Sequence, residues 1–181
     1  MSNLYTEVVK PLIKKNYREG KKVEQDFASI LSNVIWSSSK EDIKDHWDIQ
    51  GLLPSRYGIE GNNKFDVKGI KRINSKDPNK QDELAWIESR NVQGNRGWLC
   101  GEADYIVFER SNSWMVVHRK ELLLFINDKV KSLGYPKGKQ AYHIYSRAGR
   151  KDKLTLAPFK DLKSLPLTKE IPKDKSNEVY S

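Results

Sequence analysis

Cysteine and long apolar runs are scarce in this chain of 181 residues. Its single cysteine, Cys100, can form neither an internal disulfide nor a multi-cysteine zinc site, which predicts a reducing, cytoplasmic compartment. No apolar run approaches the ~20 residues that a membrane-spanning helix needs, and residues 1–15 lack the apolar core of a secretory signal. No Gly-x-Gly-x-x-Gly or Walker-type loop is present either. These absences argue against a membrane partner, a secreted protein and a small-molecule enzyme of another class.

Basic residues, by contrast, are in excess. Lys and Arg number 33 against 24 Asp and Glu, which gives a formal net charge of +9 and favours polyanionic partners such as DNA or RNA. The 37% of hydrophobic and 10% of aromatic residues are enough for a packed core, and the length suits one domain. We expect a single domain over residues 1–165 and a loose, polar, proline-bearing tail over residues 166–181.

The apolar spacing predicts a helical beginning and a sheet after it. Residues 4–38 have a helical pattern that is interrupted at 16–20, and Val23, Phe27 and Val34 belong to one apolar stripe. Ser39 and Asp42 predict a short helical turn. Strands are expected at 46–53, 63–73, 84–92, 103–109, 113–118, 141–145 and 154–157, and a helix at 121–133. This order predicts a mixed α/β domain with one sheet flanked by helices, in which 103–109 is a central strand.

The segment Phe65-Asp66-Val67-Lys68-Gly69 carries the strongest chemical signal. Side chains alternate along a strand, so Asp66 and Lys68 share one face while Phe65 and Val67 pack on the other. An ion pair on an exposed strand is the common alternative for such a pattern.

Asp48 lies on the strand expected before that segment. A hairpin of the two strands would bring Asp48 beside Asp66, whereas a cap or turn residue is the alternative reading of Asp48. Two adjacent carboxylates repel each other unless a cation neutralises them, and oxygen ligands of this kind suit Mg²⁺.

An acidic residue on an early strand, followed by Asp/Glu-x-Lys on the next, resembles the signature of the PD-(D/E)xK nuclease superfamily. The resemblance spans about residues 20–165, with Trp47 standing in place of the proline of the motif. It implies a restriction-endonuclease-like fold and a Mg²⁺-dependent endonuclease acting on DNA, with Mn²⁺ able to replace Mg²⁺.

The resemblance also implies roles for individual residues. Asp48, Asp66 and the backbone carbonyl of Val67 would hold the metal, together with Glu24 on the preceding helix, directly or through water. Lys68 would orient or deprotonate the attacking water, or offset charge that builds on phosphorus. Glu88, on the following strand, is as easily a further site carboxylate as a surface partner of Arg90, and His46 is expected to be structural.

Basic side chains near these segments are candidates for phosphate contacts, which are sensitive to salt and indifferent to sequence. They are Lys71, Arg72, Arg96, Arg147, Arg150 and Lys151. A catalytically inactive nucleic-acid-binding module of the same fold and an RNA-directed nuclease are the alternatives. A homodimer would favour paired cuts and a monomer a nick, and the sequence leaves both open.

Overall fold

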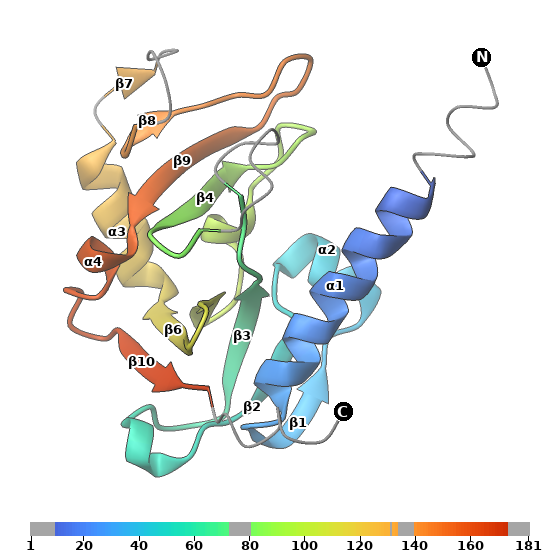
Figure 1. Ribbon diagram of the computed structural model, residues 1–181, viewed down its shortest axis with the longest axis vertical. Coiled ribbons are helices and arrows are strands. Elements are labelled where there is room, and N and C mark those ends of the chain that lie inside the picture. The colour runs from blue at the N-terminus through green and yellow to red at the C-terminus, as the bar shows by residue number, and fades with distance from the viewer. Residues whose placement is uncertain (1–9, 73–80, 131, 134–139, 174–181) are drawn as a thin grey trace.

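The computed structural model describes residues 10–72, 81–130, 132–133 and 140–173. This part of the chain has the predicted mixed α/β structure with a central sheet flanked by helices (Figure 1). The central sheet has six strands and is mostly antiparallel. In spatial order the strands are β1 (Ser32–Trp36), β2 (Ile49–Leu52), β3 (Asn63–Lys68), β5 (Tyr105–Glu109), β6 (Ser113–His118) and β10 (Lys169–Pro172). The helices are α1 (Lys10–Ala28), α2 (Ser39–Asp45), α3 (Arg119–Lys129) and α4 (Phe159–Leu162), with 3-10 turns η2 (Ser55–Tyr57) and η3 (Trp98–Cys100).

The expectation of one sheet is wrong, because four strands leave the main sheet. β4 (Leu84–Arg90) pairs with β9 (Lys153–Pro158) in an antiparallel ribbon, and β7 (Ser132–Leu133) pairs with β8 (His143–Ile144). β4 lies in the connection between β3 and β5, which pair in parallel and therefore need a long crossover. That crossover carries β4 out of the sheet plane.

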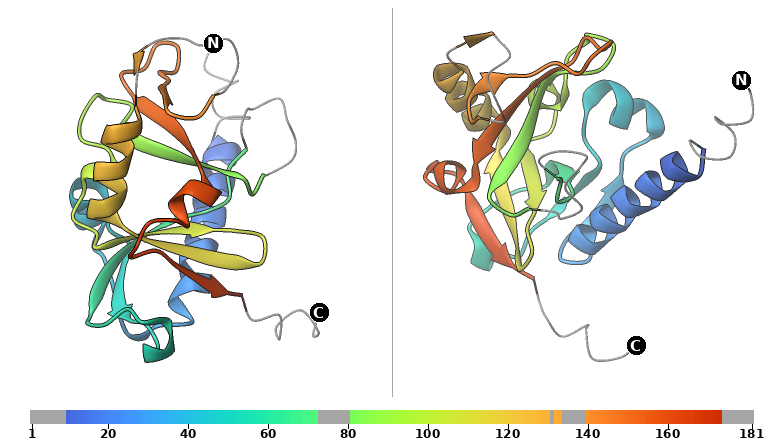
Figure 2. Two further views of the ribbon diagram at one scale, coloured as in Figure 1. Left: turned by 90° about the vertical axis from the view of Figure 1, so that its left-hand side faces the viewer. Right: turned by 45° about the horizontal axis from the view of Figure 1, so that its top comes forward.

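Two apolar layers hold the sheet between its helices, and Figure 2 shows α1 and α3 on its opposite sides. On the α1 side, Phe27 packs edge-on against Phe65 and Trp114, with ring centroids 5.4 Å apart in each pair. On the α3 side, Ile106 and Phe108 of β5 are buried, whereas Val107 belongs to the α1 side. β5 is thus buried on both faces, which confirms it as a central strand.

The first helix differs from its prediction. α1 runs without a break through residues 16–20; Gly20, exposed and free of close neighbours, costs such a helix only about 1 kcal/mol relative to alanine. Residues 32–36, expected to end a helix, form β1, because Val34, Ile35 and Trp36 suit a strand that can pair with β2. Val34 is 36% exposed, so it does not belong to the core stripe. The expected helical residues 4–9 lie outside the described residues.

α2 begins where the serine and acidic residues predicted a helical turn. Ser38 and Glu41 form a capping box, in which the Glu41 carboxylate accepts from the Ser38 backbone N–H at 2.9 Å. The helix ends at Asp45 and is capped by His46, whose backbone is left-handed with φ 55°. The chain thereby turns toward β2, which begins directly after Asp48.

The expected loose tail is also wrong as far as Lys173. Residues 169–172 form β10, which pairs antiparallel with β6 and places Ile171 opposite Trp114. Ile171 is fully buried, so the main sheet includes this C-terminal strand. Residues 174–181 of the expected tail lie outside the described part. None of the helices in the described ranges is long and apolar enough to cross a membrane.

We predict that Ile171→Ala lowers the free energy of unfolding by about 2–5 kcal/mol, because it leaves a cavity in the α1-side core. Leu167→Ala is the control at a half-exposed position outside the strand and should change it by less than about 0.5 kcal/mol. Urea unfolding followed by tryptophan fluorescence measures both. Equal stabilities of the two variants would show that β10 is not part of the folded protein in solution.

Candidate active site

Asp48 is held at the end of the β2–β3 pair by its own backbone and side chain. Its N–H donates to the Phe65 carbonyl at 2.8 Å, and its carbonyl accepts from the Ser37 N–H at 3.0 Å. Its carboxylate accepts from the Val67 N–H, with 2.7 Å between nitrogen and Oδ2. The predicted hairpin is therefore confirmed, and the register in which Ile49 faces Phe65 carries Asp48 to Asp66.

Asp66 and Lys68 share a face of β3 as predicted, and they form a close ion pair. Lys68 Nζ lies 2.5 Å from Asp66 Oδ1. The Asp66 side chain is 2% exposed and that of Lys68 27%, so the alternative of an ion pair on an exposed strand is wrong. The Lys68 ammonium also lies 5.4 Å from the ring centroid of Trp98, whose face attracts a cation.

The pKa of Asp66 lies well above its usual range. Burial is the main cause, the charge of Asp48 and a contact between the two carboxyl groups add to it, and Lys68 opposes it. Burial lowers the pKa of Lys68, but the charges of Asp66 and Asp48 outweigh burial and leave that pKa raised. Lys68 is therefore an ammonium ion at neutral pH.

One oxygen of this cluster has no partner among the described residues. Asp66 Oδ2 is buried and accepts no hydrogen bond from any residue that the structure describes, a state that costs free energy unless a cation or water satisfies it. Within the described ranges, no group of three or more His, Cys, Asp or Glu side chains is placed to hold a metal ion. Mg²⁺ is commonly bound by one or two carboxylates and several waters, so Asp48 and Asp66 suffice.

The backbone of Val67 adds a potential oxygen ligand. The N–H and C=O of a strand residue point to the same neighbouring strand, and the Val67 N–H points to Asp48. Its carbonyl therefore faces the same side of β3 as Asp48, beyond the Ile49–Phe65 pair that ends the β2–β3 ladder. The donor set of two carboxylates and one carbonyl therefore fits Mg²⁺.

Glu24 lies at the edge of this cluster. Its carboxylate forms an ion pair of 2.6 Å with Lys21 on the same helix. Burial raises the pKa of Glu24, Lys21 lowers it and the charge of Asp48 raises it again. Glu24 is thus near Asp48, as expected, but its nearest charge is an ammonium group.

Two further carboxylates, those of Asp42 and Glu88, lie near the site. Burial and the charge of Asp48 raise the pKa of Asp42, which the sequence marked only as part of a helical turn. Burial raises the pKa of Glu88, and Lys68 is the strongest charge opposing that rise. Glu88 therefore belongs beside the site. A site role for Glu88 was one of two open readings from the sequence, whereas the place of Asp42 had no sequence signal, because it depends on how α2 packs beside β3.

The six basic candidates occupy two surface regions. Lys71 and Arg72 are exposed just beyond β3, where Trp86 Nε1 donates to the Arg72 carbonyl at 3.0 Å. Arg96, Arg147, Arg150 and Lys151 are exposed on the loops that end the β4–β9 ribbon. In Figure 1 the end of β3 lies between α1 and this ribbon.

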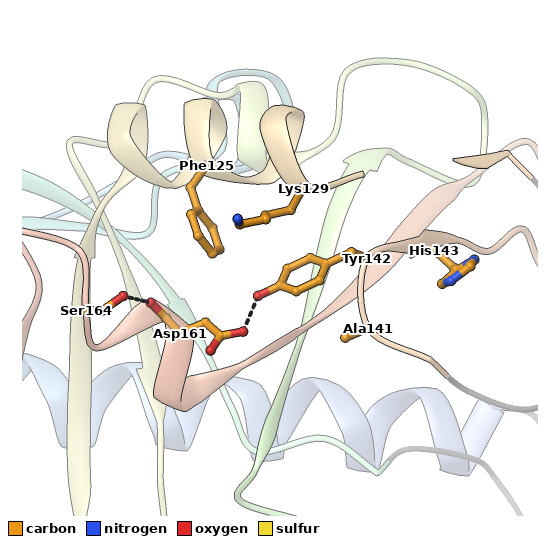
Figure 3. Close-up of a pocket in the computed structure, with 7 residues that line it drawn as sticks. All are labelled: Phe125, Lys129, Ala141, Tyr142, His143, Asp161 and Ser164. Carbon is orange, nitrogen blue, oxygen red and sulfur yellow. Dashed lines mark hydrogen bonds between the residues drawn. The ribbon is translucent and has the colours of Figure 1, made fainter. Parts of the chain in front are cut away.

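A cavity of about 560 Å³ lies elsewhere, beside α3 (Figure 3). It is lined by Phe125, Lys129, Ala141, Tyr142, His143, Asp161 and Ser164. The Tyr142 hydroxyl donates to Asp161 at 2.6 Å, and burial together with this bond raises the pKa of Tyr142. None of the residues around Lys68 lines this cavity, so it is separate from the candidate site.

No family model, curated protein or solved structure matches the chain.

We predict that the stability of Asp66→Asn relative to the unmodified, metal-free protein rises as the pH rises. With its raised pKa, folded Asp66 keeps a proton that the unfolded chain releases above about pH 3.8, so unfolding is favoured as the pH rises towards the folded pKa. The variant has no such proton to lose. Urea unfolding in EDTA at pH 4.5, 6 and 7.5 measures the difference.

The exposed Asp26 supplies the control for this pH series. Asp26→Asn should show a stability difference from the unmodified protein that does not grow with pH. If the difference for Asp66→Asn stays constant or shrinks as the pH rises, the pKa of Asp66 is not raised.

Proposed function

We propose that the protein is a Mg²⁺-dependent endonuclease that hydrolyses phosphodiester bonds of DNA on a restriction-endonuclease-like fold of the PD-(D/E)xK type. The observation that carries the proposal is the placement of two buried carboxylates opposite each other, Asp48 directly before β2 and Asp66 on β3. Asp66 Oδ2 lacks a partner among the described residues, while Oδ1 is paired with Lys68. A buried pair of carboxylates is unfavourable without a cation, and such clusters are typical of sites that bind one.

Asp48, Asp66 and the Val67 carbonyl would hold the ion, and Glu24 would contact it through water. When bound, Mg²⁺ supplies Lewis-acid polarisation of the scissile phosphate and lowers the pKa of a bound water. Hydrolysis joins the water oxygen to phosphorus and breaks a P–O bond, and the resemblance implies 5′-phosphate and 3′-hydroxyl ends.

Lys68 in its ammonium form is suited to donate hydrogen bonds rather than to accept a proton as a base. Its raised pKa keeps three N–H donors in the site, which can orient the attacking water and stabilise charge that builds on the phosphate oxygens. A cation on Asp48 and Asp66 would offset the charges that raise this pKa, which eases proton loss from Lys68 after the ion is bound.

A direct assay tests the activity. The protein is incubated with supercoiled plasmid, linear duplex, single strands, a four-way junction and RNA, each in Mg²⁺, Mn²⁺ or EDTA. Metal-dependent cutting of DNA supports the proposal. DNA that is bound but uncut would favour the inactive binding module, and cutting of RNA alone would favour the ribonuclease.

We predict that Lys68→Met lowers the rate of DNA cleavage at least about 10²-fold, because it removes the ammonium donor while keeping an unbranched side chain. DNA binding, measured in Ca²⁺ by fluorescence anisotropy, should change little. Lys160→Met makes the same change at an exposed position of α4 and should cleave normally. Cleavage by Lys68→Met at the unmodified rate would remove Lys68 from the mechanism.

We also predict that Mg²⁺ raises the melting temperature of the protein but not that of Asp66→Asn. At a concentration of ten times Kd, binding to the folded state alone adds about 1.4 kcal/mol, which corresponds to about 3–5 °C for a domain of this size. Asp26→Asn should retain the shift. An equal shift in Asp66→Asn would place the ion elsewhere.

A further inference from the structure

A compact basic projection lies at the end of the β4–β9 ribbon. We define the basic finger as residues 90–97 and 146–153, the two loops and the strand ends that carry them. It holds six basic residues and one acidic residue, a formal charge of +5 within a chain of +9. Figure 1 shows the ribbon running upward to these loops, away from the six-stranded sheet.

The one acidic residue of the finger, Asp152, forms hydrogen bonds within the finger itself. Asp152 is fully buried, and it accepts from the Arg147 N–H at 3.0 Å and from the Arg147 guanidinium. The positive charge of Arg147 is thus offset, whereas Arg96, Arg150 and Lys151 extend from exposed positions. The surface of the finger is therefore almost purely cationic.

The two loops are joined into one rigid unit. The Lys151 N–H donates to the Val92 carbonyl at 3.2 Å, and Asn91 Oδ1 accepts from the N–H groups of Gln93 and Asn95. Gly97 lies so close to β4 that a Cβ there would stand 2.6 Å from the Glu88 carbonyl. Such preformed loops lose little conformational entropy on binding.

The finger is also fixed beside the candidate active site. The His46 ring forms a hydrogen bond of 3.1 Å with the Arg96 carbonyl, and His46 lies two residues before Asp48. At the other loop, the charges of both Arg147 and Lys68 act on Glu88. A nucleic-acid backbone bound by the finger would therefore pass close to Lys68.

The composition of the finger favours a duplex over a single strand. Surfaces for single strands combine basic groups with aromatic side chains on which bases stack, and residues 90–97 and 146–153 contain no Phe, Tyr or Trp. A two-stranded ribbon fits the major groove of B-form DNA, whereas the major groove of A-form RNA is too deep and narrow for side chains to read.

We propose that the basic finger enters the major groove of duplex DNA and contacts phosphates on both sides of it, next to the phosphate that reaches Lys68. This inference rests on the proposed function, and it names B-form duplex DNA as the substrate. Binding in EDTA, where the proposed cleavage cannot occur, tests it separately from catalysis.

The test compares Arg150→Ala/Lys151→Ala with Lys120→Ala/Lys160→Ala, which removes the same charge from exposed positions of α3 and α4. The unmodified protein should bind DNA duplex more tightly than single strands or RNA duplex. Loss of two phosphate contacts should weaken duplex binding about 10–100-fold at about 0.1 M salt and reduce the slope of log K against log salt by about 2. Arg96→Gln, on the other loop, should reduce the slope by about 1.

Two results would overturn the proposed role of the basic finger. One is that the finger variants bind duplex DNA as tightly as the control variant does, and the other is that the unmodified protein binds single strands or RNA duplex as tightly as DNA duplex. If the unmodified protein cleaves DNA while the finger variants bind normally, the DNA-binding role of the finger is wrong and the proposed function stands. If duplex binding depends on the finger but no metal produces cleavage, the DNA-binding role of the finger is supported and the proposed function is wrong.

Discussion

The hydrogen bond from the Val67 N–H to the Asp48 carboxylate is the contact on which the candidate site depends. It replaces a strand–strand bond at the end of the β2–β3 pair, so the geometry of the sheet directly positions an acidic side chain. Because β3 is a rigid, paired strand, Asp66 and Lys68 are positioned by the same contact. The site is thus built on regular structure, which holds reacting groups more accurately than loops do.

The same arrangement concentrates charge in a buried place. Asp48 and Asp66 are 6% and 2% exposed, and Lys68 and Lys21 are the ammonium groups that balance Asp66 and Glu24. A fold selected only for stability would not bury such a cluster, since replacing charged groups by apolar ones is often neutral or stabilising. The proposed cation and phosphate would complete this cluster, so the proposed activity would come at a cost in stability.

Short loop contacts join elements that are distant in sequence. His46, expected to be structural, bonds to the Arg96 carbonyl and connects the start of β2 to the basic finger. The absence of a side chain at Gly101 allows the loop after Trp98 to pack closely against His46, because a Cβ on Gly101 would stand 2.6 Å from the His46 Cβ. These contacts place Trp98 over Lys68 and the finger beside Asp48.

Strand alternation and the apolar run of β5 determined much by themselves: the mixed α/β class, the central strand and the shared face of Asp66 and Lys68. Local pattern did not reveal that residues 32–36 are a strand, that β4 and β9 leave the sheet, or that Ile171 is buried, because pairing partners distant in sequence decide these. The place of Asp42 near Asp48 was missed for the same reason, whereas Glu88 was already a candidate on the sequence. Periodicity reports which face of an element is apolar, whereas electrostatics depends on distances that only packing sets.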